Sequence, residues 1–206
     1  MRCYCIVLDK NNERMENFYK MKNTLPNLEL FSAHTPNDIQ YFKNKGYIFN
    51  KSLKQTEIAC LLSHVGICKK IVDENIPYAM IFEDDALFYD NFNEIIDTLE
   101  IPKDFKFIQI HIPFFKNIPE LHNSNNNFSK YEPIHSTAGY IISNQMANEI
   151  YSLTKINRPI DHIYIGMADK NFYCINTCIM TALSKNPRKD RTNVREGKTL
   201  FKSTVQ

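Results

Sequence analysis

A large charge of one sign, a long apolar run and a glycine-rich loop are all missing from this chain of 206 residues. Its 25 Lys and Arg residues against 23 Asp and Glu residues give a net charge of +2, so no overall field favours nucleic acid as a partner. The first apolar run, residues 3–8, is too short for a signal peptide or a membrane span, and we therefore expect a cytoplasmic protein. Only 5 Gly residues are present, and no glycine-rich or basic phosphate loop follows Leu8, which disfavours enzymes that hold nucleotide phosphates in this way.

Chain length and cysteine spacing narrow the class further. The chain is long enough to bury the core of one domain. Its six Cys residues form neither a Cys-x-x-Cys pair nor a compact secreted framework, which indicates reduced, mostly buried thiols. We expect one domain over residues 1–186 and a basic tail over residues 187–206. The tail is either solvated or in peripheral contact with the anionic inner face of the cytoplasmic membrane, where each basic residue contributes about 1 kcal/mol.

The most informative feature is an apolar run that ends in three consecutive acids. Residues 78–82 have no polar face, which is typical of a strand covered on both sides in an α/β sheet. Glu83, Asp84 and Asp85 follow at its carboxyl end, where open α/β sheets bind ligands. Adjacent carboxylates repel one another unless a cation or a shared proton intervenes. The run therefore indicates a Mg²⁺ or Mn²⁺ site facing nucleotide phosphates, and a solvated turn is the alternative.

Strand and helix patterns alternate along the chain and predict an α/β fold. Residues 38–48 have no clear period, and residues 113–135, with three prolines, are expected to form a long loop. A last structured region begins at residues 159–165. The expected strands are residues 3–8, 28–33, 78–82, 105–111, 137–142 and 172–182, and the expected helices are residues 13–25, 56–74, 92–99 and a segment capped by Ser143.

The helix over residues 56–74 carries the clearest apolar stripe. Thr56 is its expected N-cap, and Glu57 suits the positive end of the helix dipole. Glu57 and His64 are seven residues apart and therefore share one face. An acid and an imidazole on one face are more often a structural pair than a functional one, so spacing alone leaves both interpretations open.

Several segments, taken in order, resemble glycosyltransferase family 25, the lipopolysaccharide-biosynthesis galactosyltransferases and their relatives. Residues 56–64, Thr-Glu-Ile-Ala-Cys-Leu-Leu-Ser-His, resemble the family's Gly-Glu-x-x-Cys-x-x-Ser-His helix, with Thr56 in place of glycine. Residues 70–85 are similar to its Pro-Tyr and Leu-Glu-Asp-Asp segment, with Phe82 before the acids. Residues 137–143 resemble its Thr-Ala-Gly-Tyr-x-x-Ser strand. Residues 159–161 are similar to its Pro-x-Asp, and residues 4–14 to its opening strand.

This resemblance implies a single GT-A-like (Rossmann-like) domain with a mainly parallel central sheet. It also implies a nucleotide-sugar donor, a divalent cation and inversion at the anomeric carbon. The acidic run would stand for the Asp-x-Asp motif of such folds, with Asp85 on the metal and Glu83 on the metal or the donor ribose. Asp161 is our candidate for the catalytic base, although it equally suits a turn-capping role. His162 is a candidate for completing the metal shell, or it forms an ordinary hydrogen-bonded pair with Asp161.

Further donor-binding candidates are Asp9, Arg14, Glu57, His64 and Asp84. Capping and surface pairing explain Asp9 and Arg14 equally well. The resemblance implies transfer of a hexose, galactose from UDP-galactose by family habit, to a lipopolysaccharide or lipooligosaccharide acceptor, with Mn²⁺ in preference to Mg²⁺. The alternatives are a metal-dependent nucleotidyltransferase and a non-catalytic nucleotide-sugar-binding protein.

Overall fold

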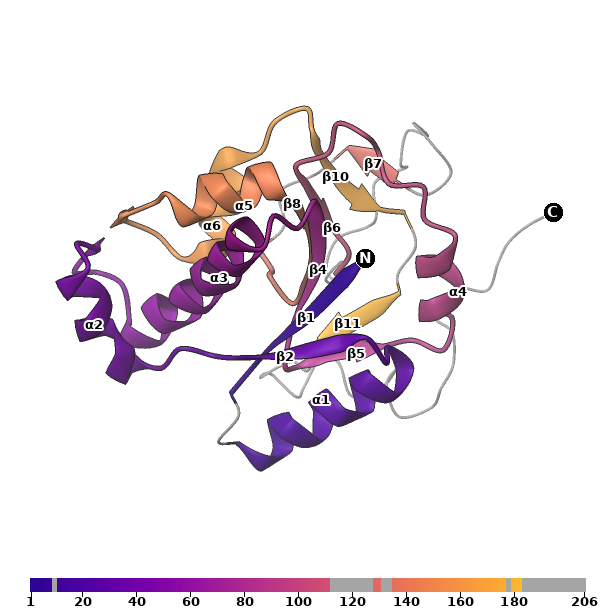
Figure 1. Ribbon diagram of the computed structural model, residues 1–206, viewed down its shortest axis with the longest axis horizontal. Helices are drawn as coiled ribbons and strands as arrows, with labels where there is room; N and C mark the ends of the chain where they lie inside the picture. Colours follow the sequence, from indigo (N-terminus) through magenta and orange to yellow (C-terminus); the bar gives the residue numbers. More distant parts are fainter. Residues whose placement is uncertain (9–10, 112–127, 131–134, 177–178, 183–206) are drawn as a thin grey trace.

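The computed structural model describes residues 1–8, 11–111, 128–130, 135–176 and 179–182. Within these residues, seven strands form one central sheet in the order β2-β1-β4-β8-β6-β10-β7 (Figure 1). Asp9, the tail over residues 187–206 and most of the loop expected over residues 113–135 lie outside the described part of the chain. The strands are β1 (Arg2–Val7), β2 (Leu28–Ser32), β4 (Tyr78–Glu83), β6 (Phe107–Gln109), β7 (Phe128–Lys130), β8 (Gly139–Ser143) and β10 (Phe172–Ile175).

The prediction of a mainly parallel α/β sheet is confirmed. β1 pairs in parallel with β2 and β4, and β6 pairs in parallel with β10. β8 lies antiparallel between β4 and β6, and β7 is antiparallel to β10. Five of the seven strands in the described part of the sheet therefore run in one direction. The antiparallel β8 begins where β4 ends, so residues that precede β8 lie beside the acidic run.

Helices cover both faces of the sheet (Figure 1). On one face lie α3 (Gln55–Asp73), α5 (Asn144–Tyr151) and α6 (Ile160–Met167), and on the other lie α1 (Asn12–Thr24) and α4 (Phe92–Asp97). Side chains of a strand point alternately to the two faces. In β4, Ala79 and Ile81 pack on the α3 side, whereas Met80 and Phe82 pack on the α1 side. This alternation directs Glu83 toward α3.

Local sequence explains how the helices near the site begin. Ser143 caps α5 as predicted, because its side chain accepts from the backbone N–H of Met146. The predicted N-cap of α3 is wrong by two residues. α3 begins at Gln55 with Lys54 as N-cap, and the Glu57 carboxylate accepts from the Lys54 backbone N–H at 2.8 Å. A carboxylate at the third helical position commonly satisfies the N-cap donor in this way.

Some elements lack a clear sequence signal. A short 3-10 turn (Pro36–Asp38) and α2 (Ile39–Asn44) occupy the stretch without a period, next to α3. Two small pairings join distant segments: β3 (Ile48–Phe49) with β9 (Lys155–Ile156), and β5 (Ala86–Phe88) with β11 (Met180–Ala182). Among the described residues, no helix combines the length and the apolar character that a membrane span requires.

Candidate active site at the carboxyl end of β4

Glu83 is the last residue of β4 and lies at the edge where β8 begins. Its backbone N–H donates to the carbonyl of Ala138 at 3.1 Å. Its carboxylate Oε1 lies 3.2 Å from His64 Nε2 of α3 and accepts the Thr137 hydroxyl hydrogen bond. Both contacts converge on Oε1, and Oε2 takes part in neither. Two donors therefore orient this carboxylate.

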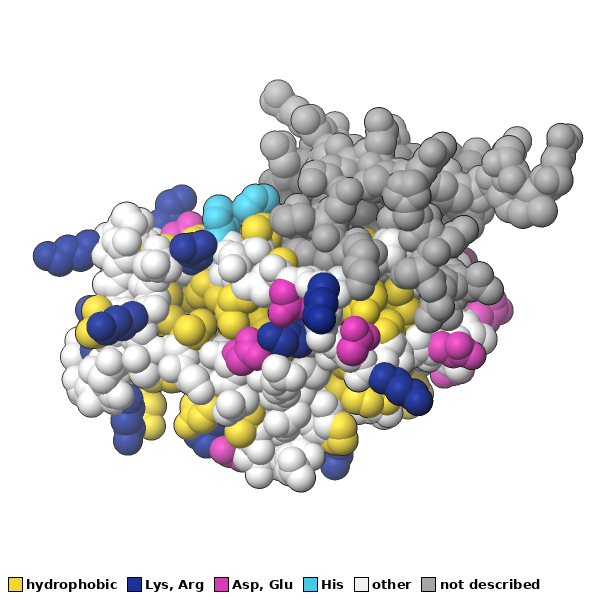
Figure 2. Space-filling view, turned by 90° about the horizontal axis from the view of Figure 1, so that it is seen from above, with side chains coloured by type: hydrophobic (Ala, Val, Ile, Leu, Met, Phe, Trp, Pro, Cys, Tyr) yellow, Lys and Arg dark blue, Asp and Glu magenta, His cyan; other side chains and the backbone are white. Residues whose placement is uncertain are grey.

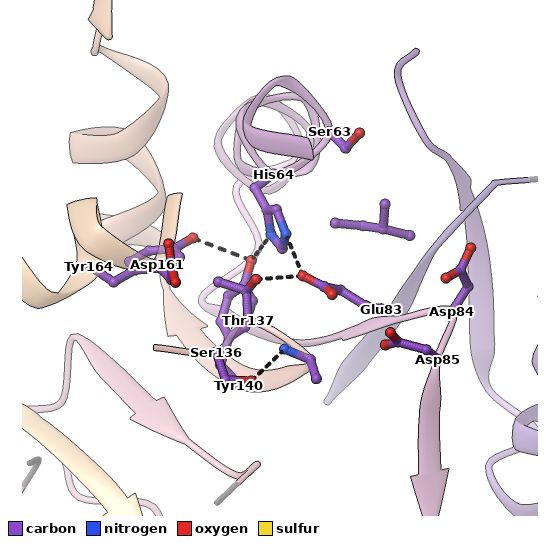
Figure 3. Close-up of polar contacts among 12 residues, drawn as sticks. Ser63, His64, Glu83, Asp84, Asp85, Ser136, Thr137, Tyr140, Asp161 and Tyr164 are labelled. Carbon is purple, nitrogen blue, oxygen red and sulfur yellow. Dashed lines mark hydrogen bonds and ion pairs between the residues drawn. The ribbon is translucent and has the colours of Figure 1, made fainter. Parts of the chain in front are cut away.

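A chain of buried hydrogen bonds, called the relay below, runs from His64 through Tyr140 to Tyr164 of α6 (Figure 3). The Tyr164 hydroxyl donates to the Tyr140 hydroxyl at 3.3 Å, and Tyr140 lies 2.7 Å from His64 Nδ1. Because the Tyr140 hydroxyl accepts from Tyr164, its own proton is available for Nδ1. This assigns the single proton of a neutral imidazole to Nε2, which donates to Glu83. Each relay side chain is at most 1% exposed. The relay thus links α3, β8 and α6 to one oxygen of Glu83.

The relay determines the protonation state of Glu83. Burial by itself would raise its pKa, but the hydrogen bonds from His64 and Thr137 stabilise the ionised form, and the net effect is a lowered pKa. Glu83 is therefore a carboxylate at neutral pH, held in one orientation.

Asp84 connects the acidic turn, by hydrogen bonds, to the segment between β1 and α1 and to α1 itself. One carboxylate oxygen accepts from the Leu8 backbone N–H at 2.8 Å, and the other accepts from Arg14 Nη1 at 2.9 Å. Asn17 of α1 donates to the backbone carbonyls of Asp84 and Ala86 at 2.8 and 2.9 Å. The carboxyl ends of parallel β1 and β4 meet at this edge, which explains why residues so distant in sequence are in contact. The structure thus gives Asp84 and Arg14 a structural role at the site.

Asp85 is the least satisfied acid of the run. Its Oδ2 lies 3.5 Å from Arg14 Nη1, but its buried Oδ1 has no hydrogen-bond partner. Burial, and after it the nearby charge of Glu83, raise the pKa of Asp85, and with the opposing effect of Arg14 included the pKa is about 6. An orphaned buried carboxylate oxygen is costly unless a proton or a cation satisfies it. The unpartnered oxygen of Asp85 is therefore of the kind that an oxygen-preferring divalent cation takes, although among the described residues the three acids do not form a converging group of ligand atoms.

Asp161 and His162 lie in the first turn of α6, where the structure brings them together with His135. Asp161 Oδ1 accepts from the His162 backbone N–H at 2.9 Å, and its Oδ2 lies 3.6 Å from His135 Nδ1. The rings of His135 and His162 are 4.4 Å apart. In the described part of the chain, His162 thus groups with Asp161 and His135 and not with Glu83 and Asp85. Figure 3 draws Asp161 beside Tyr164, the first residue of the relay.

Several residues that contact the acidic turn, or that are connected to it through hydrogen bonds, were missed by sequence reasoning. Thr137 and Tyr140 belong to a recognised motif, and an antiparallel pairing of that motif with β4 would have located them. Tyr164 and Asn17 carried no signal, because helix spacing does not tell which polar residue reaches a neighbouring strand. His111 lies within hydrogen-bonding distance of the Ser136 hydroxyl, and burial lowers its pKa to about 4, although the charge of Glu83 opposes this shift.

The architecture defines the class: an α/β protein that presents a carboxylate cluster at the carboxyl end of a central strand, as nucleotide-dependent enzymes do. The family model for glycosyltransferase family 25 (LPS biosynthesis protein) matches residues 1–164. The chain belongs to this family. The matched range ends within α6 and includes the acidic run, the relay and Asp161.

Curated relatives agree with this assignment. Over 104 residues the chain is 38% identical to the lacto-N-neotetraose biosynthesis glycosyltransferase LgtE of Neisseria meningitidis, covering 45% of this chain and 37% of the relative. Over 188 residues it is 28% identical to the lipooligosaccharide biosynthesis protein lex-1 of Haemophilus influenzae, covering 73% of this chain and 61% of the relative. The chain thus spans less than two thirds of the length of these relatives.

Proposed function

We propose that this glycosyltransferase is an inverting, cation-dependent enzyme that moves galactose from UDP-galactose to a lipooligosaccharide or lipopolysaccharide acceptor. The observation that carries the proposal is the unpartnered, buried Oδ1 of Asp85 beside the ionised, oriented Glu83. The galactose donor and the saccharide acceptor follow the family resemblance and the names of the relatives.

Asp85 and Glu83 are the residues that would hold the cation, with Mn²⁺ preferred to Mg²⁺. When bound, the cation supplies charge stabilisation to the departing diphosphate. Glu83 offers Oε2 to the cation or to a donor ribose hydroxyl, because Oε1 is already engaged by His64 and Thr137. The predicted place of His162 in this shell is not carried into this proposal, because His162 groups with His135 and Asp161. Asp84 and Arg14 keep the acidic turn in position between α1 and β1.

Asp161 is the proposed catalytic base. Inversion by a single displacement requires a group that removes the proton of the acceptor hydroxyl as its oxygen bonds to the anomeric carbon. The bond from that carbon to the diphosphate breaks at the same time, and its electron pair leaves with UDP. Asp161 Oδ1 is occupied by the His162 backbone N–H, so Oδ2 is the oxygen available to take the proton. Tyr164, one turn further along α6, joins this helix to the relay that orients Glu83.

Release of UDP from a panel of UDP-sugars, with Mn²⁺ or with EDTA and with a lipooligosaccharide acceptor, tests the function. We expect release from UDP-galactose with Mn²⁺ and none with EDTA. Asp161→Asn should still bind UDP but transfer sugar about 10²–10⁴ times more slowly. Turnover that is unchanged by EDTA, or by Asp161→Asn, would contradict the corresponding part of the mechanism.

The same assay separates the alternatives. Release of inorganic pyrophosphate from a nucleoside triphosphate and a sugar phosphate would identify a nucleotidyltransferase. UDP-galactose binding without any release, in the presence of acceptor, would identify a non-catalytic binding protein. Vesicle flotation with and without residues 187–206 tests the tail, since equal binding of both proteins to anionic vesicles removes it as the membrane contact.

A further inference from the structure

We propose that His135, Asp161 and His162 form a binding site for a divalent transition-metal ion, with Zn²⁺ preferred, that is separate from the acidic turn. Each residue offers one ligand atom, and these atoms all lie within 4.8 Å of one another. His135 precedes β8, whereas Asp161 and His162 are adjacent in the first turn of α6. Two segments of the chain thus contribute to the site.

The spacing suits a small ion. Ligand atoms about 2.0–2.1 Å from a tetrahedral zinc ion are about 3.3 Å from one another. His135 Nδ1 and Asp161 Oδ2 are already 3.6 Å apart. The His162 ring centroid lies 4.4 Å from that of His135, and one His162 ring nitrogen is within 4.8 Å of the ligand atoms of the other two residues. Asp161 is anchored by its hydrogen bond to the His162 backbone N–H, so part of the site is pre-ordered.

The chemistry of the ligands separates this site from the acidic turn. Two imidazoles and one carboxylate favour Zn²⁺ and other late transition metals, whereas the all-carboxylate turn favours Mg²⁺ or Mn²⁺. Three protein ligands leave one position for water or a substrate group. The site is also accessible: His135 and His162 are the exposed histidines among the described residues, and histidine side chains gather at one place on the surface in Figure 2.

The alternative cluster of Cys60, His64 and Glu83 is a poorer zinc site. Both ring nitrogens of His64 already have partners, Tyr140 and Glu83. Metal binding there would break the relay. At the α6 site, by contrast, the only contact of the His135 ring nitrogens within the described part of the chain is with Asp161, which is itself a proposed ligand.

Occupation of the α6 site would have a functional consequence. Asp161 is the proposed base, and a zinc ion on its carboxylate would prevent it from accepting a proton. Zinc should therefore inhibit transfer while Mn²⁺ supports it. This consequence rests on the proposed function, but the binding site itself does not.

Calorimetric titration of the EDTA-treated full chain with ZnCl₂ tests the binding site. We expect one ion per chain, with affinity reduced at least about ten-fold in His135→Ala and in His162→Ala. His34→Ala is the matched control, because His34 faces Asp38 at 3.9 Å without a second imidazole, and it should bind zinc as the parent does. Both substituted histidines of the site are exposed, so the variants should fold.

A second measurement excludes thiols. Co²⁺ in place of Zn²⁺ should give a visible spectrum without a thiolate charge-transfer band, and Cys60→Ser should leave it unchanged. Equal zinc affinity of the parent and the His135→Ala/His162→Ala double variant would overturn the proposal, as would a thiolate band lost in Cys60→Ser.

Inhibition separates the two proposals. With Mn²⁺ at saturation, zinc should inhibit the parent but lose at least about ten-fold in potency against His135→Ala, each compared with its own zinc-free rate. A protein that binds zinc through these histidines but transfers no sugar would contradict the proposed function alone. A protein that transfers sugar and shows no histidine-dependent zinc binding would contradict the site alone.

Discussion

Glu83 and Asp85 are two residues apart in one turn, yet they lie in opposite environments. Glu83 points to the α3 side, where His64 and Thr137 hold one oxygen and lower its pKa. Asp85 lies on the side of Arg14 with a buried, unpartnered oxygen and a pKa raised to about 6. The difference shows that the protein itself satisfies one carboxylate and leaves one oxygen of the other without a hydrogen-bond partner. Changing each in turn separates positioning from ligand binding.

Asp85→Asn should have the largest effect. The substitution keeps the shape of the side chain but removes the charge that a cation needs, so Mn²⁺-dependent UDP release should fall about 10³-fold. Steady-state rates over a range of Mn²⁺ concentrations measure this. Asp97→Asn, at an exposed acid on α4, is the control and should be unaffected. A parent-like Mn²⁺ dependence of Asp85→Asn would remove Asp85 from the cation site.

Tyr140→Phe tests the hydrogen bonds that support Glu83. Loss of the hydroxyl leaves His64 Nδ1 and the Tyr164 hydroxyl buried without their shared partner, which should lower the free energy of unfolding by about 1–3 kcal/mol. Urea denaturation measures the change. Tyr41→Phe, at a tyrosine that is 60% exposed, is the matched control. Equal stability of both variants would mean that the relay contributes nothing.

The raised pKa of Asp85 predicts a pH-dependent cation affinity. A cation binds the ionised carboxylate, so below pH 6 a proton must leave first. The affinity for Mn²⁺ should be constant above about pH 7 and fall about ten-fold per pH unit below about pH 6. The paramagnetic resonance signal of free Mn²⁺ measures the affinity. An affinity that does not change between about pH 5 and pH 7 would show that Asp85 does not titrate with the site.

Stability without a cation should change in opposite directions for the two acids. The folded pKa of Asp85, about 6, exceeds its unfolded value, so this group makes the folded state less stable as pH rises from about 4 to 6. At about pH 7 in EDTA, Asp85→Asn should therefore raise the free energy of unfolding by about 1–2 kcal/mol. Glu83→Gln should lower it by about 1–2 kcal/mol, because an amide cannot accept both hydrogen bonds at one end with the same strength. If both substitutions changed the free energy of unfolding in the same direction, the proposed difference between Glu83 and Asp85 would be wrong.

Much of the fold was predictable from local patterns. β1, α1, β2, α3 and β4 coincide with predicted elements, because each combines a continuous apolar run or an apolar stripe with clear end signals. The Ser143 cap was predicted for the same reason, since a serine before a helix acts within three residues. α2 and the pairing of β5 with β11 were not predictable, because short elements are stabilised by packing against distant segments.

The site was predictable in part. The acidic run and its place at a strand's carboxyl end followed from the sequence, and so did His64 and Asp161 as residues of interest. The roles of these residues did not follow from the sequence. Glu57 was a donor-binding candidate beside His64, with a structural pair as the alternative. The structure shows that its carboxylate caps α3, since the third helical position lies beside the N-cap donor, and its role toward a donor stays a prediction. Asp9 lies outside the described residues, so its role stays a prediction.

By itself, the sequence determined the family, the α/β alternation and the three acids at the carboxyl end of β4, because apolar patterning and residue order are local properties. Only the tertiary structure decided how those acids differ. The antiparallel β8 places Thr137 and Tyr140 against Glu83, whereas β1 and α1 place Arg14 between Asp84 and Asp85. It also brought His135 to Asp161 and His162. Burial and hydrogen-bond partners determine the chemistry of a carboxylate, and both arise only when distant segments pack together.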